Sequence, residues 1–184
     1  MQTTVTRDLT TPSLAAWGIR GQDTAHVLAT LIDRSPLPLT VLLQGLADVK
    51  LRITVVSTGS RGLSVSEAHL LDAPEGTPCR WRTARLETAD GELAAGVFLL
   101  WLPSRLDPGI CAQLDAAQEP AGVILDRIPG GMQRQERRAA ACNVIDETTG
   151  QDASIMSRAV LVAGGQPVGI AEENFMTAFV QSLG

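Results

Sequence analysis

The sequence predicts an α+β fold in which helices lead into a single antiparallel β-sheet and cover it. Three observations support this prediction. Apolar residues within the first 45 positions recur at helical spacing, whereas apolar and polar residues alternate strictly over positions 49–55. Two glycine-containing pairs, Asp90-Gly91 and Gly164-Gly165, are typical of β-hairpin turns. Helices that precede a run of hairpin-connected strands favour the α+β class.

Length and composition indicate one folded domain that spans residues 1–184. Of these residues, 45% are apolar and 19% are charged, which excludes a disordered chain and a coiled coil. A net charge of −5 and the absence of tyrosine argue against a nucleic-acid partner. No apolar run approaches the roughly 20 residues of a membrane span, and residues 1–11 do not resemble a signal peptide. We therefore expect a cytoplasmic protein with no membrane partner, whose oligomeric state stays open.

Three helices are predicted before the first strand. Thr11-Pro12 is a typical helix start, because proline is tolerated at the first helical position. A second helix is predicted to begin near Asp23, with its apolar residues on one face. Ser35-Pro36 opens a third helix, which is predicted to end at Gly45.

Strands are predicted from residue 49 onward. The alternating segment 49–55 is followed by a predicted turn at residues 59–62, and Leu63 and Val65 then suggest the partner strand. The Asp90-Gly91 pair connects a strand at residues 79–87 to a strand at residues 93–102. Because residues 93–102 are almost wholly apolar, we expect this strand to lie in the centre of the sheet.

The second half of the chain predicts two short helices and a final set of strands. The helical segments are residues 110–117 and 121–127, and a Pro-Gly-Gly break follows them. Residues 133–145 favour a strand, although their centre also suits a helix. After a turn at residues 147–151, residues 155–163 and 167–175 form the last hairpin through Gly164-Gly165.

The sequence lacks the residue patterns that several kinds of functional site require. The two histidines, His26 and His69, have no cysteine or carboxylate at ligand spacing, so no metal site is expected. Cys79, Cys111 and Cys142 are far apart and odd in number, which favours buried thiols in a reducing compartment. There is no nucleophile elbow, no phosphate-binding loop and no dinucleotide fingerprint.

The last strand carries the clearest candidate site. Gly169, Ala171, Glu173 and Phe175 share one face of it, because side chains alternate along a strand. Small residues beside a carboxylate leave volume above the sheet, as a ligand cavity requires. The alternative interpretation is a solvent-exposed face on which Glu173 is merely hydrated.

Arginines supply the opposite charge. Arg80 and Arg82 share a face of the strand at residues 79–87, and either of them could project into a cavity and clamp a carboxylate. Arg134, Arg137 and Arg138 form a cationic cluster after the Pro-Gly-Gly break. The alternative in both places is an ordinary solvated strand face.

The order of these pieces resembles the chorismate pyruvate-lyase family. The resemblance covers most of the chain and is carried by Leu39-Thr40, Trp81-Arg82, the Asp90-Gly91 hairpin ending in Pro103, Pro120-Ala121-Gly122, Arg158, Gly165-Gln166-Pro167 and Glu173-Asn174-Phe175. It implies an antiparallel sheet covered by helices, a ligand enclosed in a cavity, and no cofactor. It also implies a carbon–oxygen lyase that eliminates pyruvate from chorismate to give 4-hydroxybenzoate.

The resemblance also implies roles for particular residues. Arg82 would clamp the ring carboxylate, and Glu173 would hydrogen-bond the ring oxygen as acid, base or anchor. Arg134 would meet the enolpyruvyl carboxylate, and Arg158 would support the pocket. The helical turn at Ala121 and Gly122 would approach the ligand, with the backbone amide of Ala121 touching its carboxylate.

Small residues in the pocket leave two other functions open. Gly169 and Ala171 stand where the family commonly has larger residues, which implies a wider cavity. The first alternative is therefore an enzyme of the same fold that cyclises or rearranges a larger biosynthetic intermediate. The second is a non-enzymatic small-molecule-binding module, because regulator effector domains of related fold share the Gly-x-Pro hairpin. A small-molecule partner is common to all three.

Overall fold

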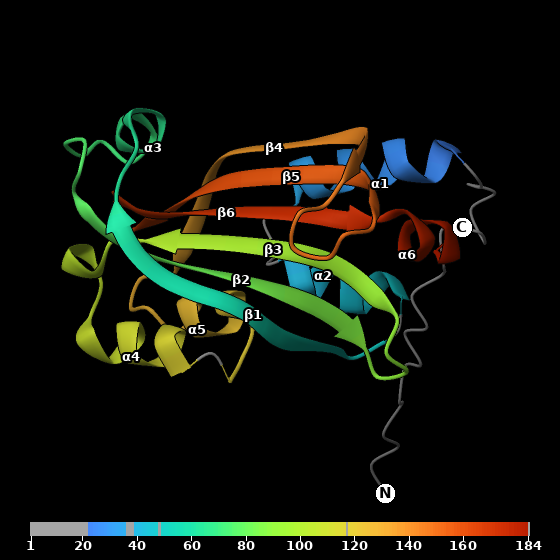
Figure 1. Cartoon of the computed structure of the whole chain (residues 1–184), viewed down its shortest axis with the longest axis horizontal. Coiled ribbons are helices and arrows are strands. Elements are labelled where there is room, and N and C mark those ends of the chain that lie inside the picture. The colour runs from blue at the N-terminus through green and yellow to red at the C-terminus, as the bar shows by residue number, and fades with distance from the viewer. Residues whose placement is uncertain (1–21, 36–38, 48, 117, 184) are drawn as a thin grey trace, which may run out of the picture.

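The computed structural model describes residues 22–35, 39–47, 49–116 and 118–183. The elements follow one another in the order α1 (Gln22–Arg34), α2 (Leu39–Ala47), β1 (Leu51–Gly62), α3 (Val65–Leu70), β2 (Pro78–Thr88), β3 (Leu93–Trp101), a 3-10 helix η2 (Pro103–Arg105), α4 (Pro108–Ala116), α5 (Ala121–Leu125), β4 (Met132–Ile145), β5 (Asp152–Ala163), β6 (Gln166–Met176) and α6 (Thr177–Ser182). The six strands form one sheet in the order β1-β2-β3-β6-β5-β4, and every neighbouring pair is antiparallel. The predicted α+β class with a single antiparallel sheet is confirmed (Figure 1).

The helices cover the two faces of this sheet unequally. On one face, which we call the inner face, α1 and α2 contribute Leu28, Ile32 and Leu43 to a cluster with residues of the sheet and of α6. Further along the same face, α4 and α5 pack Leu114 and Leu125 against β3 and β5. The short helix α3 packs on the opposite, outer face. Figure 1 shows α1 and α2 behind the sheet in this view.

The N-terminal helices follow the sequence pattern only in part. The helix predicted near Asp23 is α1, and the next predicted helix corresponds to α2. The predicted end at Gly45 is wrong, since α2 continues to Ala47 and Gly45 lies exposed within it. The helix predicted at Thr11-Pro12 and the start at Pro36 lie outside the described residues.

The segment after the first predicted strand differs from expectation. Residues 59–62 are not a turn, because β1 runs for 12 residues to Gly62 and pairs along its length with β2. Gly59 is explained by packing: a Cβ atom there would lie 2.7 Å from the Trp81 ring. Residues 63–66 do not form a strand either. Ser64 caps α3, since its hydroxyl accepts from the backbone N–H of Glu67 while the Glu67 carboxylate accepts from the N–H of Ser64.

The remaining strands agree with the sequence. The Asp90-Gly91 turn connects β2 to β3, and β3 lies in the interior of the sheet between β2 and β6. Residues 132–145, which also suited a helix, form strand β4 at the edge. Gly164 and Gly165 adopt positive φ angles of 57° and 79° in the β5–β6 turn, a conformation that glycine adopts at little cost.

None of the described helices is long and apolar enough to cross a membrane.

Candidate functional site

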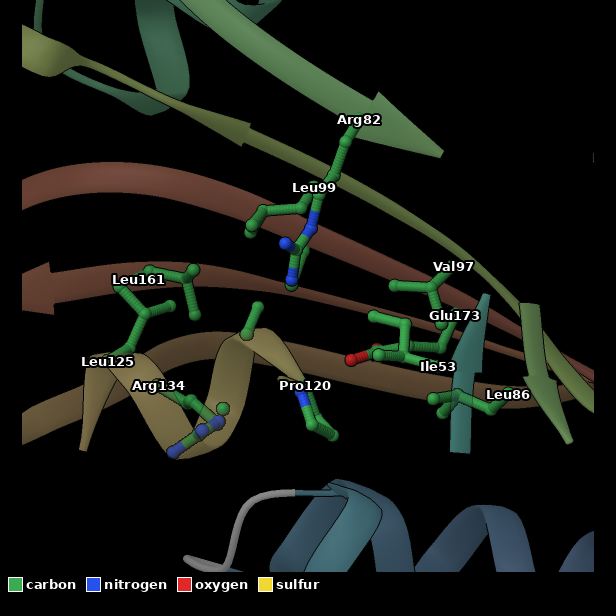
Figure 2. Close-up of a pocket in the computed structure, with 13 residues that line it drawn as sticks. Ile53, Arg82, Leu86, Val97, Leu99, Pro120, Leu125, Arg134, Leu161 and Glu173 are labelled. Carbon is green, nitrogen blue, oxygen red and sulfur yellow. The ribbon is translucent and has the colours of Figure 1, made fainter. Parts of the chain in front are cut away.

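A pocket lies on the inner face of the sheet, beneath the first turn of α5 (Figure 2). Apolar side chains such as Ile53, Leu99 and Leu125 form most of its wall, and the charged residues in it are Arg82, Arg134 and Glu173. The cavity volume is about 60 Å³. This is small compared with the roughly 300–1,000 Å³ of pockets that enclose drug-sized ligands.

Arg82 is the most unusual residue of the pocket. Its side chain points inward from β2 and is only 1% exposed, although it is an arginine (Figure 2). Its Nη1 donates to the backbone carbonyl of Leu114 in α4 at 2.9 Å, whereas its Nη2 is buried and has no hydrogen-bond partner among the described residues. Burial lowers the pKa of the Arg82 guanidinium, because water no longer stabilises its charge. The result is a buried cation with an unused donor.

The structure also distinguishes Arg82 from Arg80. Both side chains project from the same face of β2, but Arg80 lies near the solvent and pairs with Asp115 of α4. The side chain of Arg80 is 46% exposed. Arg82 therefore lines the pocket and Arg80 does not.

Arg134 enters the pocket from the edge strand β4. Its side chain is 10% exposed and its Nη2 lies 3.7 Å from the carboxylate of Asp126, which ends α5. Asp126 is 43% exposed, so water weakens this pair. Arg134 remains available to an anion inside the pocket.

Glu173 projects from β6 into the same cavity (Figure 2). Burial raises the pKa of its carboxyl group to about 7, and the nearby charges of Arg137 and Arg134 oppose this rise. Ser157, the residue opposite Glu173 on β5, adds a polar hydroxyl beside it. Near neutral pH the Glu173 side chain is thus divided between its acid form, which donates a hydrogen bond, and its carboxylate form, which accepts one.

We expect the pKa of Glu173 to make the protein less stable as the pH rises. The unfolded carboxyl ionises near its ordinary pKa of 4.5, whereas the folded carboxyl resists ionisation until about 7. Ionisation therefore favours the unfolded chain, and the free energy of unfolding should fall by about 3 kcal/mol across this interval. Glu173→Gln should remove the fall and be the more stable protein above pH 7. Urea unfolding of both proteins below pH 4.5 and above pH 7 measures this change in the free energy of unfolding.

Glu172→Gln is the matched control for this experiment. Glu172 is the neighbour of Glu173 on β6 but lies on the outer face, where it is 44% exposed and close to Arg158. This variant should keep the pH dependence of the original protein. If the free energy of unfolding of the Glu173→Gln protein falls equally between these pH values, groups other than Glu173 cause the pH dependence.

The structure places Ala121, Gly122 and Ala171 in the wall of the pocket together with Arg82, Arg134 and Glu173. Pro120 precedes α5 and also lines the cavity. The sequence therefore predicted residues from four separate segments, β2, α5, β4 and β6, that meet at one place.

Two predicted site residues lie elsewhere. Arg158 is paired with Glu172 on the outer face, because it alternates with Ser157, which points inward. Gly169 does not line the pocket: a Cβ atom there would overlap the backbone carbonyl of Leu100 on β3. This glycine permits close approach of two strands, so the wider cavity inferred from it is a wrong expectation.

Arg137 belongs to the surroundings of the site, although the sequence suggested a solvated position. It is 9% exposed, and its charge acts on the Glu173 carboxyl more strongly than that of Arg134 does. A register shift in β4 between Gln135 and Arg138 turns Arg137 inward. Strict alternation from Arg134 would place it on the outer face, so the sequence pattern carried no signal for it.

Metal-binding residues do not gather in the described part of the chain. No group of three or more histidine, cysteine, aspartate or glutamate side chains there could hold a metal ion. His26 lies on α1 and His69 on α3, far from each other in the chain. Cys79, Cys111 and Cys142 are free thiols, of which the first two are buried.

Comparison with known proteins identifies the fold but not a family. No protein-family model and no curated protein matches the sequence. Among solved structures, PhnF from Mycobacterium smegmatis matches with a TM-score of 0.62 and 11% identity over 79% of this chain and 66% of PhnF. The chain therefore spans just under two thirds of the length of PhnF. The separate effector domain of PhnF matches with a TM-score of 0.60 and 11% identity, over 78% of this chain and 93% of that domain.

A third solved structure with the same fold is also a regulator domain. The ligand-binding domain of a GntR-family transcriptional regulator from Bordetella bronchiseptica matches with a TM-score of 0.56 and 13% identity, over 69% of this chain and 85% of that domain. The fold is chorismate lyase-like, as the resemblance implied. The neighbours that share it are effector and ligand-binding domains of transcriptional regulators.

These neighbours correct the expected activity. The resemblance implied a carbon–oxygen lyase, but the structural neighbours are effector and ligand-binding domains of regulators, so the expected lyase assignment is overturned. The fold is common to both classes, and a fold does not determine a reaction. What these neighbours show for this chain is its fold.

Proposed function

We propose that this chain is a binding module for a small organic acid, and that the carboxylate of the acid is held by Arg82. The observation that carries this proposal is the buried guanidinium of Arg82 with an Nη2 atom that has no hydrogen-bond partner among the described residues. A buried charge without a counter-ion is costly, so such a group is kept where a ligand completes it. A carboxylate suits it, because the planar guanidinium can donate two parallel hydrogen bonds.

The remaining pocket residues define the rest of the ligand. Leu99, Leu125 and Leu161 provide apolar walls that suit a ring or a short hydrocarbon chain. Glu173 supplies one polar partner, which can accept from a hydroxyl group or donate to a carbonyl oxygen, depending on its protonation. Arg134 adds a second cation at the side of β4. A cavity of about 60 Å³ favours a small ligand.

The similar solved structures support a binding role. They are described as an effector domain and as a ligand-binding domain of transcriptional regulators. We extend to this chain only the role of binding a small effector molecule. The acidic character of that molecule comes from Arg82 and Arg134 of this chain.

The proposal is tested with matched pairs of small molecules. Benzoate and 4-hydroxybenzoate should raise the melting temperature of the protein, whereas benzamide, which has the same shape without the charge, should not. A ligand present at a hundred times its Kd stabilises the folded state by roughly 2.7 kcal/mol. Calorimetric titration of the best acid then gives its affinity.

Two results would overturn the proposal. One is that small aromatic and aliphatic acids at millimolar concentration raise the melting temperature no more than the matched amides do. The other is pyruvate release from added chorismate, which would restore an enzymatic role. Neither pyruvate nor 4-hydroxybenzoate is expected to appear.

A further inference from the structure

We propose that Arg137 couples occupancy of the pocket to the docking of helix α1, so that an acid bound in the pocket holds α1 more firmly on the sheet. This inference rests on the proposed function, because it concerns what the bound acid does to the rest of the fold. Arg137 donates to the end of α1 and also feels the charge of Glu173 in the pocket.

The first observation is the irregularity in β4 that turns Arg137 inward. The pairing of β4 with β5 slips between Gln135 and Arg138, and Glu136 has a φ of 50°, a left-handed value that is unusual outside glycine. Arg134 faces the pocket before this bulge and Arg137 is buried after it. A bulge changes the face of the sheet to which the following side chains point. The unfavourable backbone conformation of Glu136 persists only because the surrounding structure stabilises it.

The second observation is the connection of Arg137 to α1. Its Nη1 donates to the backbone carbonyl of Ile32 at 3.1 Å and to that of Ser35 at 2.6 Å. These carbonyls lie in the last turn of α1 and directly after it, where a cation is favourable because the helix dipole is negative there. The N–H of Ala139 on β4 also donates to the Asp33 carboxylate at 3.3 Å. Arg137 and Ala139 together attach the end of α1 to the sheet.

The third observation is the connection of Arg137 to the pocket. Strand β5 lies between β4 and β6, and its inward residues at this level are Ser157 and Ala159, which are 1% and 3% exposed. Both side chains are small, and Glu173 pairs with Ser157, so only small residues of β5 separate Glu173 from β4 on this face. The attraction is evident in the pKa of Glu173, which the charge of Arg137 lowers more than any other group does.

Arg137 therefore interacts both with the end of α1 and with Glu173 in the pocket. The charged groups that act on it in the described part of the chain are Glu173 from β6, Arg134 from β4 and Asp33 from α1. An acid held by Arg82 adds negative charge to the pocket and favours the protonated form of Glu173. Its carboxylate lies at β2, farther from β4 than Glu173 on β6, so it replaces the attraction of Glu173 for Arg137 only in part. Neutral Glu173 attracts Arg137 less, which leaves the guanidinium to the carbonyls of α1. Binding and α1 docking are then coupled, and the coupling is reciprocal.

Amide hydrogen exchange of residues 22–35 tests this without any ligand. Glu173→Gln imitates the protonated carboxyl, so the amides of α1 should exchange severalfold more slowly in this variant than in the original protein. Glu172→Gln, on the outer face of the same strand, should leave their exchange unchanged. Arg137→Lys keeps the charge but cannot hold two carbonyls with the same geometry, and it should speed their exchange. Arg138→Gln, at the exposed neighbouring position, is its control.

The decisive comparison is the double variant Arg137→Lys/Glu173→Gln. If Arg137 carries the coupling, the effect of Glu173→Gln on α1 should be smaller in the Arg137→Lys background than in the original protein. Equal effects in the two backgrounds, or no effect of Glu173→Gln at all, would overturn the inference. Because Glu173→Gln leaves Arg137 intact, the test survives even if Arg137→Lys folds poorly.

A second arm separates this inference from the proposed function. With benzoate as the probe and its binding verified by calorimetry, α1 exchange should slow in the original protein. Benzoate binding without any change in α1 would overturn the coupling and leave the binding function standing. Coupling in the variant cycle without binding of any small acid would refute the binding function and restrict the role of Arg137 to the free protein.

Discussion

Arg82→Met is expected to weaken the binding of small acids strongly while the protein stays folded. Loss of a buried charged anchor leaves the carboxylate of the ligand without its main partner, at a cost of about 2–4 kcal/mol. This corresponds to a loss of affinity of roughly 30-fold to 1,000-fold. The free protein should not lose stability, because methionine fills similar volume and the buried charge is gone. Calorimetric titration and urea unfolding measure the two effects.

Arg80→Met provides the matched control for this substitution. Arg80 projects from the same face of the same strand, two residues away, but pairs with Asp115 near the solvent. Its replacement should change neither affinity nor stability by much. Undiminished binding in the Arg82→Met protein would remove Arg82 from the site. A loss of several kcal/mol of stability would show instead that its hydrogen bond to Leu114 is a structural requirement.

Gly96→Ala is expected to produce the largest loss of stability among these substitutions. Gly96 lies on β3, and the buried carboxylate of Asp146 occupies the place that a Cβ atom would take. That carboxylate accepts from the Asn174 side chain at 2.8 Å and from the N–H of Thr149 at 2.8 Å. An added methyl group must displace Asp146 and break these bonds, at a cost of about 2–4 kcal/mol.

The control for Gly96→Ala is Gly45→Ala. Gly45 lies exposed in α2 with nothing within 4 Å of a Cβ atom, so alanine there should stabilise the helix by about 0.5–1 kcal/mol. Asp146→Ala combined with Gly96→Ala should cost less than the sum of the two single changes, because the overlap is then absent. Strict additivity would contradict the proposed contact. Thermal unfolding of the four variants provides the comparison.

Much of the sheet could be predicted, because strands and hairpins leave local patterns. The run at residues 93–102 is apolar on both faces, and it forms the interior strand β3. The Asp90-Gly91 and Gly164-Gly165 pairs connect strands as predicted. The wrong turn prediction at residues 59–62 arose from a contact between two strands. Gly59 was interpreted as a turn residue, but it makes room for the Trp81 ring across the β1–β2 pair.

The candidate site was predictable where strand alternation is regular. Ala171 and Glu173 share the inward face of β6 as expected, and Arg82 enters the same pocket from β2. The positions of Gly169 and Arg137 could not be inferred in this way. The first depends on the approach of the Leu100 carbonyl, and the second on a bulge at Glu136 that has no glycine to mark it.

The sequence pattern did not decide whether the protein is an enzyme or a binding domain. The resemblance to a lyase family was correct for the fold and wrong for the enzymatic role, because the structural neighbours are regulator effector domains. Arg82, Arg134 and Glu173 suit the binding of an acid as well as its conversion. Residue types alone do not distinguish these functions.

Periodicity and turn residues in this chain were sufficient for the fold class, the succession of strands from β2 onward and the inward face of β6. They suffice because alternation and positive-φ glycines are properties of neighbouring residues. Tertiary structure alone decided that Arg82 is buried without a full set of partners, that Gly169 serves strand contact, and that Arg137 lies between Glu173 and α1. Each of these depends on atoms brought together from distant segments, and no local pattern records such distances.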